Sequence, residues 1–281
     1  MIHLMSFMNS VVRSESESVS DVVMHHITDY VITTGFIGKI NETFLSEKLF
    51  GIFDMRITKW VIMLWVSMLL CLIIFIPLAR KIKKNAMGSK SRWVNMWEVL
   101  INFVHNDIVG SYFHGQSAKA ATPYFATVFF FILFANLCGL IPGAATATGN
   151  LGVTAALALC TLVGIFAVGL VKQGPKYLVK GFVPGGVPAP LFPVLWVLEL
   201  VGIFIKPFAL MIRLFANMTA GHIVIIIFLY LVMMFQSLWV GIGSVLGALM
   251  IYLLELLVAF IQAYIFATLS AMFIADSMHA H

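Results

Sequence analysis

The sequence predicts an all-α polytopic membrane protein with five membrane-crossing segments and one amphipathic helix lying along the membrane surface. Hydrophobic residues make up 61% of the 281 positions and charged residues only 10%, whereas soluble domains average about 45–50% and about 25%. The apolar runs are long and unbroken, unlike the alternating segments of about 10 residues that build membrane β-barrels. This composition excludes a soluble enzyme, a disordered chain and a nucleic-acid-binding protein, and the net charge of +5 does not indicate a nucleic-acid partner.

The first crossing is predicted over residues 60–79, which carry no formal charge and lie between Lys59 and Arg80. About 20 apolar residues span the hydrocarbon core of a bilayer once. Basic residues follow at once, and such clusters stay on the cytoplasmic or matrix side of a membrane. We therefore expect residues 1–58 to form an extramembrane tail on the outer side and residues 59–281 to form the membrane domain.

The next element is predicted to be an interfacial helix on the inner surface. Its large apolar residues recur every three or four positions, which is the spacing of one helical face. They are Trp93, Trp97, Leu100, Ile101, Val104, Ile108 and Tyr112. Polar residues fill the opposite face, and a helix with this division is typical of the membrane–water boundary.

Two further crossings are predicted between Lys119 and Lys172, a stretch of 52 residues without a formal charge. Turn-forming residues between positions 142 and 150 divide it into spans at about 122–142 and 150–171. The turn carries no basic residue, so we place it outside, and the lysines after residue 171 then lie inside. The Pro/Gly-rich segment 183–190 is expected on the inner surface.

The last two helices are predicted at about 191–235 and 244–276, separated by a turn that contains Gly241 and Gly243. At 1.5 Å per residue the first would be about 67 Å long, whereas a perpendicular crossing needs about 30 Å. This helix is therefore either broken near residues 219–221 or steeply tilted in the membrane.

These two helices carry ionisable residues at membrane depth, where each charge costs about 2.5–3.5 kcal/mol to insert. The residues are Glu199, Lys206, Arg213, His222, Glu255 and Asp276. The default reading of such residues is a substrate or ion pathway. A structural role stays open for Lys206, which precedes Pro207, and for Glu199 and Asp276, which lie near helix ends where charges cost less.

The polar residues are spaced to share helix faces. Glu199, Lys206 and Arg213 are each seven positions apart, which is nearly two turns, and Asn217 follows one turn later. In the last helix Glu255, Gln262 and Asp276 are separated by seven and fourteen positions. The last helix also has alanines at every fourth position from 259 to 271, which allows another helix to approach closely. The pattern indicates a packed helical hairpin with a polar seam.

Arg213 carries the strongest functional signal, because its guanidinium remains charged at any working pH and needs an anionic or aqueous partner. His222 and Glu255 suit either a metal pair or a proton relay. Two ligands alone make a poor zinc site, so we favour proton handling and expect neither a metal nor another cofactor.

Four stretches together resemble subunit a of F-type ATP synthases. They are residues 211–222 (MIRLFANMTAGH), residues 254–266 (LELLVAFIQAYIF), Glu199 with Lys206-Pro207, and residues 136–142 (NLCGLIP). The resemblance covers about 60–280, and it is specific because Arg, Asn and Gln recur at the required separations on two helices. His222 and Glu255 stand in the order found in mitochondrial and many bacterial members, and Gly139 stands where some members carry an acid.

The resemblance implies a stator subunit whose last two helices form a long tilted hairpin against a rotating ring of c subunits. Protons would cross through two offset half-channels to and from the ring carboxylates, and Arg213 would be the essential charge that separates them. The half-channel through which protons enter would be lined by Asn217, His222, Glu255 and Gln262. The half-channel through which they leave would be lined by Glu199 and Asp276.

The implied partners are the c-subunit ring, subunit b or an equivalent peripheral stalk, the rest of the complex and the lipid bilayer. The subunit would not be an enzyme on its own, because ATP is made in other subunits. The coupling ion stays open between H⁺ and Na⁺. No mitochondrial presequence is recognised, which favours a bacterial inner membrane over the mitochondrial inner membrane.

Two alternatives remain. A secondary ion-coupled transporter would bind its substrate near the middle of the membrane, but that class usually has two related halves with paired broken helices, and no such repeat is evident. A membrane metalloenzyme would need further ligands close to His222 and Glu255.

Overall fold

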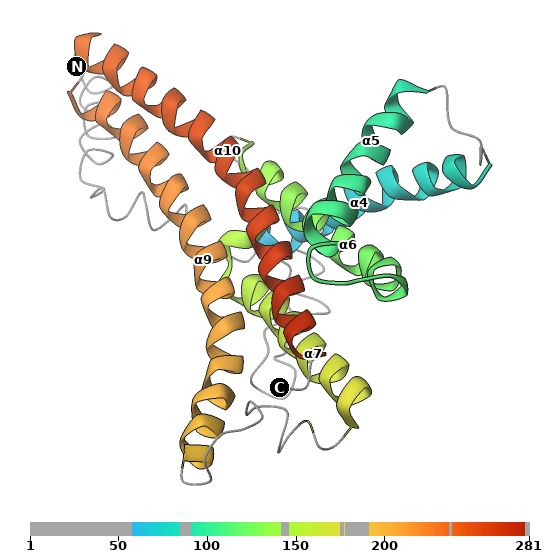
Figure 1. Ribbon diagram of the computed structural model, residues 1–281. Helices are drawn as coiled ribbons and strands as arrows, with labels where there is room; N and C mark the ends of the chain where they lie inside the picture. Colours follow the sequence, from blue (N-terminus) through green and yellow to red (C-terminus); the bar gives the residue numbers. More distant parts are fainter. Residues whose placement is uncertain are drawn as a thin grey trace, which may run out of the picture. The chain divides into compact units, whose positions relative to one another are not determined.

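A computed structural model describes residues 58–84, 91–141, 146–174, 177, 191–235 and 238–278 (Figure 1). Almost all of the described residues are helical. Apart from Thr58, the predicted tail lies outside the described residues, as do the Pro/Gly-rich segment 183–190 and part of the predicted turn at 142–150.

In the part of the chain that the structure describes, five helices are long and apolar enough to cross a membrane, as predicted. They are α4 (Lys59–Lys84), α6 (Gln116–Gly139), α7 (Leu151–Gln173), α9 (Phe192–Phe235) and α10 (Leu238–Asp276). Backbone groups in hydrocarbon have no water to bond with, so each crossing must satisfy its own amides and carbonyls, and a helix does this within one segment.

The described residues form two compact units. Unit 1 contains the described residues within 58–62 and 217–256, and unit 2 contains those within 63–216 and 257–278. The helices α9 and α10 therefore each contribute one part to unit 1 and one part to unit 2.

The predicted amphipathic helix is present in unit 2 as α5 (Arg92–Phe103), which continues into a π-helical turn over Val104–Val109. The amide of Gly110 donates to the carbonyl oxygen of His105 at 2.7 Å. Donor and acceptor are five residues apart, which is the hydrogen-bond spacing of a π-helix. The predicted apolar face is confirmed at Trp97, Val104 and Ile108, which are buried, whereas the predicted member Trp93 is exposed and its neighbour Val94 is buried instead. Tyr112 lies in the turn that follows rather than in the helix.

An aromatic cluster joins α4, α5 and α6 in unit 2. The Trp97 ring lies edge-on to Phe75, Phe130 and Phe134, with centroid distances of 5.7, 5.8 and 6.2 Å. Edge-to-face pairs at these separations contribute about 0.5–1.5 kcal/mol each beyond the area they bury. This cluster holds α5 against the two crossings on either side of it in the sequence.

The alanines of α10 allow the close approach that their spacing predicts. Ala259, Ala263, Ala267 and Ala271 are all fully buried. On this side of α10, Ser270 Oγ lies 3.0 Å from Thr161 Oγ1 of α7. A Cβ built on Gly164 of α7 would lie 2.7 Å from Ile274 Cδ1. The small residues thus let α7 pack directly on α10 within unit 2.

The helix α9 is continuous over 44 residues, so the predicted alternative of a break near residues 219–221 is wrong. At 1.5 Å per residue its length is about 66 Å, and a steep tilt in the membrane stays a prediction. Gly221 stands within this helix, and its lack of a side chain leaves room for the Glu255 carboxylate of α10.

The predicted turn at 236–244 is also too long, because α10 begins at Leu238 and both Gly241 and Gly243 are helical. A glycine inside a helix costs only about 1 kcal/mol relative to alanine. Opening a whole helical turn in apolar surroundings would leave several backbone groups without partners, which costs more. The two helices pack closely near this end of unit 1, where a Cβ on Gly247 would lie 2.6 Å from the Phe228 ring.

Candidate functional site

All the predicted site residues lie on α9 and α10, and the two units share them. Unit 1 holds Asn217, His222 and Glu255. Unit 2 holds Glu199, Arg213, Gln262 and Asp276. Among the described residues, no three His, Cys, Asp or Glu side chains are grouped as metal ligands would be.

Glu255 is the buried acid of unit 1, with only 6% of its surface exposed. Its carboxylate lies against Gly221 of α9, so that a Cβ built on Gly221 would fall on Glu255 Oε1. Among the described residues, Glu255 Oε2 has no hydrogen-bond partner. A carboxyl group in this position can take up a proton without first breaking an ion pair.

Gly221 brings His222 and Glu255 to the same level of unit 1, because the residue directly before His222 touches the Glu255 carboxylate. The His222 side chain is half-buried, and Asn217, one turn earlier on α9, is exposed. Thr219 Oγ1 is a second buried oxygen of this unit without a hydrogen-bond partner among the described residues. In the sequence, Thr219 and Gly221 mark only a possible helix break, because their position beside Glu255 depends on how α10 packs on α9.

Arg213 is exposed in unit 2, and its side chain makes no ion pair with any described residue. The opposite face of α9 is buried at Leu210 and Leu214. Ala209 and Ala216, the small residues about one turn away on either side, are also exposed. The guanidinium therefore lies on an exposed face of α9, and the residues one turn before and after it on this face are alanines.

Gln262 is buried, with 1% of its surface exposed, and lies one turn after a polar contact between α10 and α6. There, Asn136 Nδ2 donates to the carbonyl oxygen of Ala259 at 3.3 Å. Thr148 Oγ1 in turn donates to Asn136 Oδ1 at 2.7 Å. Asn136 and Thr148 are fully buried. Their hydrogen bonds therefore fix the position of α10 relative to α6 close to Gln262.

Glu199 pairs with Lys206 on the same helix, since Lys206 Nζ lies 3.5 Å from Glu199 Oε1. The Glu199 and Lys206 side chains are 47% and 33% exposed. Lys206 Nζ also lies 5.5 Å from the centroid of the Phe273 ring on α10. Asp276 is exposed three residues later, at the end of α10.

Tyr177 is an additional residue near Glu199 that the sequence analysis did not select. Its ring is buried against α7, where a Cβ on Gly169 would lie 2.5 Å from Tyr177 Cε1. Burial raises the pKa of the Tyr177 phenol, and the negative charge of Glu199 raises it further. The hydroxyl is therefore a neutral group close to a carboxylate. No local sequence signal marks it.

Gly139 lies where an acidic side chain has no room in this chain. A Cβ built on Gly139 would fall on the Thr146 side chain, which is buried. At this position the backbone of α6 therefore lies directly against the Thr146 side chain.

The family model described as ATP synthase A chain matches residues 61–275. ATP synthase subunit a of Anaeromyxobacter dehalogenans strain 2CP-C is 43% identical over 280 residues, covering 94% of this chain and 72% of the relative. ATP synthase subunit a of Chloroherpeton thalassium is 41% identical, covering 82% of this chain and 72% of the relative. ATP synthase subunit a 2 of Prosthecochloris aestuarii is 39% identical, covering 92% and 79%. The resemblance seen in the sequence is thus confirmed, and the chain belongs to the ATP synthase A chain family, the a subunits of the F-type membrane sector.

Proposed function

We propose that this chain is the stator subunit that conducts protons through two offset half-channels to and from the carboxylates of a c-subunit ring. Proton flow would thereby be coupled to rotation and to ATP synthesis in other subunits. The observation that carries the proposal is Arg213, a permanent cation exposed on α9 without an ion-pair partner in the described part of the chain.

Arg213 acts on a partner outside this chain. A cation that cannot lose its charge is costly in hydrocarbon unless an anion meets it. The exposed Ala209 and Ala216 leave room for another helix to approach the guanidinium closely. A ring carboxylate that reaches Arg213 is stabilised in its ionised form and releases its proton. Because Arg neither accepts nor passes a proton at working pH, it also prevents a direct leak between the half-channels.

The half-channel that admits protons uses Asn217, His222, Glu255 and Gln262. Glu255 supports this assignment, because it is buried and has one carboxylate oxygen uncommitted among the described residues. His222 follows the glycine that touches Glu255, and an imidazole exchanges protons near neutral pH.

The half-channel that releases protons uses Glu199 and Asp276. Both side chains are exposed, and Lys206 joins Glu199 to the part of α10 that leads to Asp276. An exposed carboxylate can receive a proton and pass it on to water.

The proposed partners are the c ring, subunit b or an equivalent peripheral stalk, the remaining subunits and the bilayer. The chain works as a multi-pass subunit of a bacterial inner membrane, as its bacterial relatives support. Residues 1–58 are proposed as an outer tail and residues 59–281 as the membrane domain. The transporter alternative is not favoured, because α9 is continuous, whereas that class uses broken helices.

The test replaces Arg213 with Ala in the whole complex and measures ATP-driven proton pumping in inverted vesicles. We expect pumping to fall at least about a hundredfold, because leaving a buried carboxylate without its partner costs about 3–5 kcal/mol. Arg92→Ala is the matched control, since Arg92 is exposed at the start of α5 and lies away from the proposed path. Coupled pumping that persists in Arg213→Ala would refute the proposal.

A further inference from the structure

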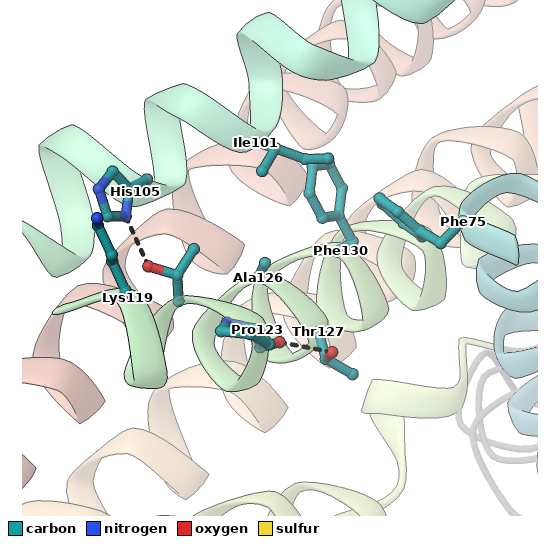
Figure 2. Close-up of a pocket in the computed structure, with 9 residues that line it drawn as sticks. Phe75, Ile101, His105, Lys119, Pro123, Ala126, Thr127 and Phe130 are labelled. Carbon is teal, nitrogen blue, oxygen red and sulfur yellow. Dashed lines mark hydrogen bonds between the residues drawn. The ribbon is translucent and has the colours of Figure 1, made fainter. Parts of the chain in front are cut away.

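Unit 2 contains a pocket that the proposed proton path does not use. Its volume is about 430 Å³, and it lies between α4, α5, the π-helical turn and the first half of α6 (Figure 2). Its polar lining groups come from His105, Lys119, Thr122 and Thr127, and the Thr127 hydroxyl donates to the carbonyl oxygen of Pro123 at 2.8 Å. The rest of its wall is mostly apolar, with Phe75, Ile101, Pro123, Ala126 and Phe130.

The polar groups are ordered by hydrogen bonds. Thr122 Oγ1 donates its one proton to the carbonyl oxygen of Ala118 at 2.7 Å. His105 Nδ1 lies 2.6 Å from the same hydroxyl oxygen and must therefore be the donor of that bond. This fixes the orientation of the imidazole and leaves Nε2 uncommitted among the described residues. Figure 2 shows His105 and Lys119 together at one end of the pocket, and Phe75 and Phe130 toward the other.

The pocket extends from the ends of two membrane crossings toward their interior, as a bound lipid would. Lys119 lies in the first turn of α6, and Phe130 lies eleven residues further along it, a rise of about 16 Å. Phe75 lies five residues before Arg80, the start of the exposed basic end of α4. The cationic end is thus at the end of both crossings, where headgroups lie, and the aromatic end is at the depth of the acyl chains.

We propose that this pocket binds an anionic phospholipid, with the headgroup phosphate at Lys119 and an acyl chain against Phe75 and Phe130. An ammonium group is cationic at neutral pH, and a phosphate diester supplies the complementary charge. The apolar wall has no polar group that would recognise a soluble anion, whereas an acyl chain fills it. Between the two ends the pocket is lined by Ala126, whose small side chain leaves room for the acyl chain.

The experiment uses the whole complex in nanodiscs that contain phosphatidylcholine and a small fraction of phosphatidylglycerol bearing a photoreactive acyl chain. Adducts are mapped by mass spectrometry to peptides of residues 101–130. Lys119→Gln is compared with Lys172→Gln, which removes an exposed lysine at the end of α7, outside the pocket. Removing one basic group at an anionic surface should lower the labelling about fivefold. We expect this loss in Lys119→Gln only.

A second variant tests the apolar end. Ala126→Leu fills the pocket without changing a charge, and it should lower phosphatidylglycerol labelling in assembled complexes. Unchanged labelling in either Lys119→Gln or Ala126→Leu would overturn the proposal. Equal labelling by a photoreactive phosphatidylcholine would show that the site does not select an anion and would also overturn it. Displacement by excess inorganic phosphate would assign the pocket to a free anion instead of a lipid.

Discussion

At the scale of single residues, Glu255 and Gly221 form the most specific contact of unit 1. The Glu255 carboxylate occupies the space where any side chain at position 221 would lie. Only glycine therefore allows α9 to approach this carboxylate. The contact makes two predictions, one for each partner.

Gly221→Ala should displace the carboxylate and lower ATP-driven pumping roughly tenfold, because crowding a packed site costs about 1–3 kcal/mol. Gly202→Ala is the matched control, since it lies on the same helix and a Cβ there meets no atom within 4 Å. Shortening the acid in the double variant Gly221→Ala with Glu255→Asp should restore part of the rate. The same rate in Gly221→Ala as in the unaltered complex would argue against a role for this contact.

Glu255→Gln keeps the shape of the side chain and removes its exchangeable carboxyl proton. We expect proton uptake to slow by about a hundredfold, the lower range of what one positioned proton-transfer group contributes, and its pH profile to change. Glu255→Asp should keep the profile at a reduced rate. The measurement is pumping rate against pH in vesicles, and an unaltered rate and profile in Glu255→Gln would deny this residue a relay role.

At the scale of elements, the network of Asn136 and Thr148 links the end of α6, the short helix at Ala147–Gly149 and α10. Thr148→Val preserves shape but leaves Asn136 Oδ1 without this donor. An unsatisfied buried polar atom costs about 1–3 kcal/mol, so the variant should unfold at lower denaturant.

The control for this variant is Thr154→Val. Thr154 is equally buried, but its hydroxyl bonds the carbonyls of Leu151 and Asn150 in its own first turn. Those carbonyl oxygens can accept hydrogen bonds from backbone amides later in the helix. Removing the Thr154 hydroxyl should therefore cost little stability. The unfolding midpoint of each variant is measured as the loss of protease resistance with increasing denaturant. Similar midpoints for Thr148→Val and Thr154→Val would contradict the role given to the network.

The helices themselves illustrate how far local signals reach. The crossings could be predicted because hydropathy and charge act on each segment separately. The predicted turn around Gly241 and Gly243 and the possible break at 219–221 were wrong, because glycine is a turn signal only where the backbone can find other partners. In apolar surroundings the helix continues.

At the scale of the whole molecule, the distribution of basic residues predicts the orientation of the crossings. Cysteine introduced at Ser91 should react with a membrane-impermeant maleimide from the inner side, and cysteine at Ile141 from the outer side. Both positions are exposed. The background is a chain with Cys71, Cys138 and Cys160 replaced, and labelling of both sites from one side would contradict the predicted topology.

The five crossings, the amphipathic helix, the family and the candidate polar residues could all be predicted from the sequence. These depend on hydropathy, charge and helical spacing, which are properties of short segments. Only the tertiary structure decided that Gly221 receives Glu255, that Tyr177 is buried near Glu199, that Asn136 bonds α10, and that a pocket lies beside Lys119. Each of these joins residues far apart in the chain, and which side chains meet is set by the close packing of helices, which no single segment encodes.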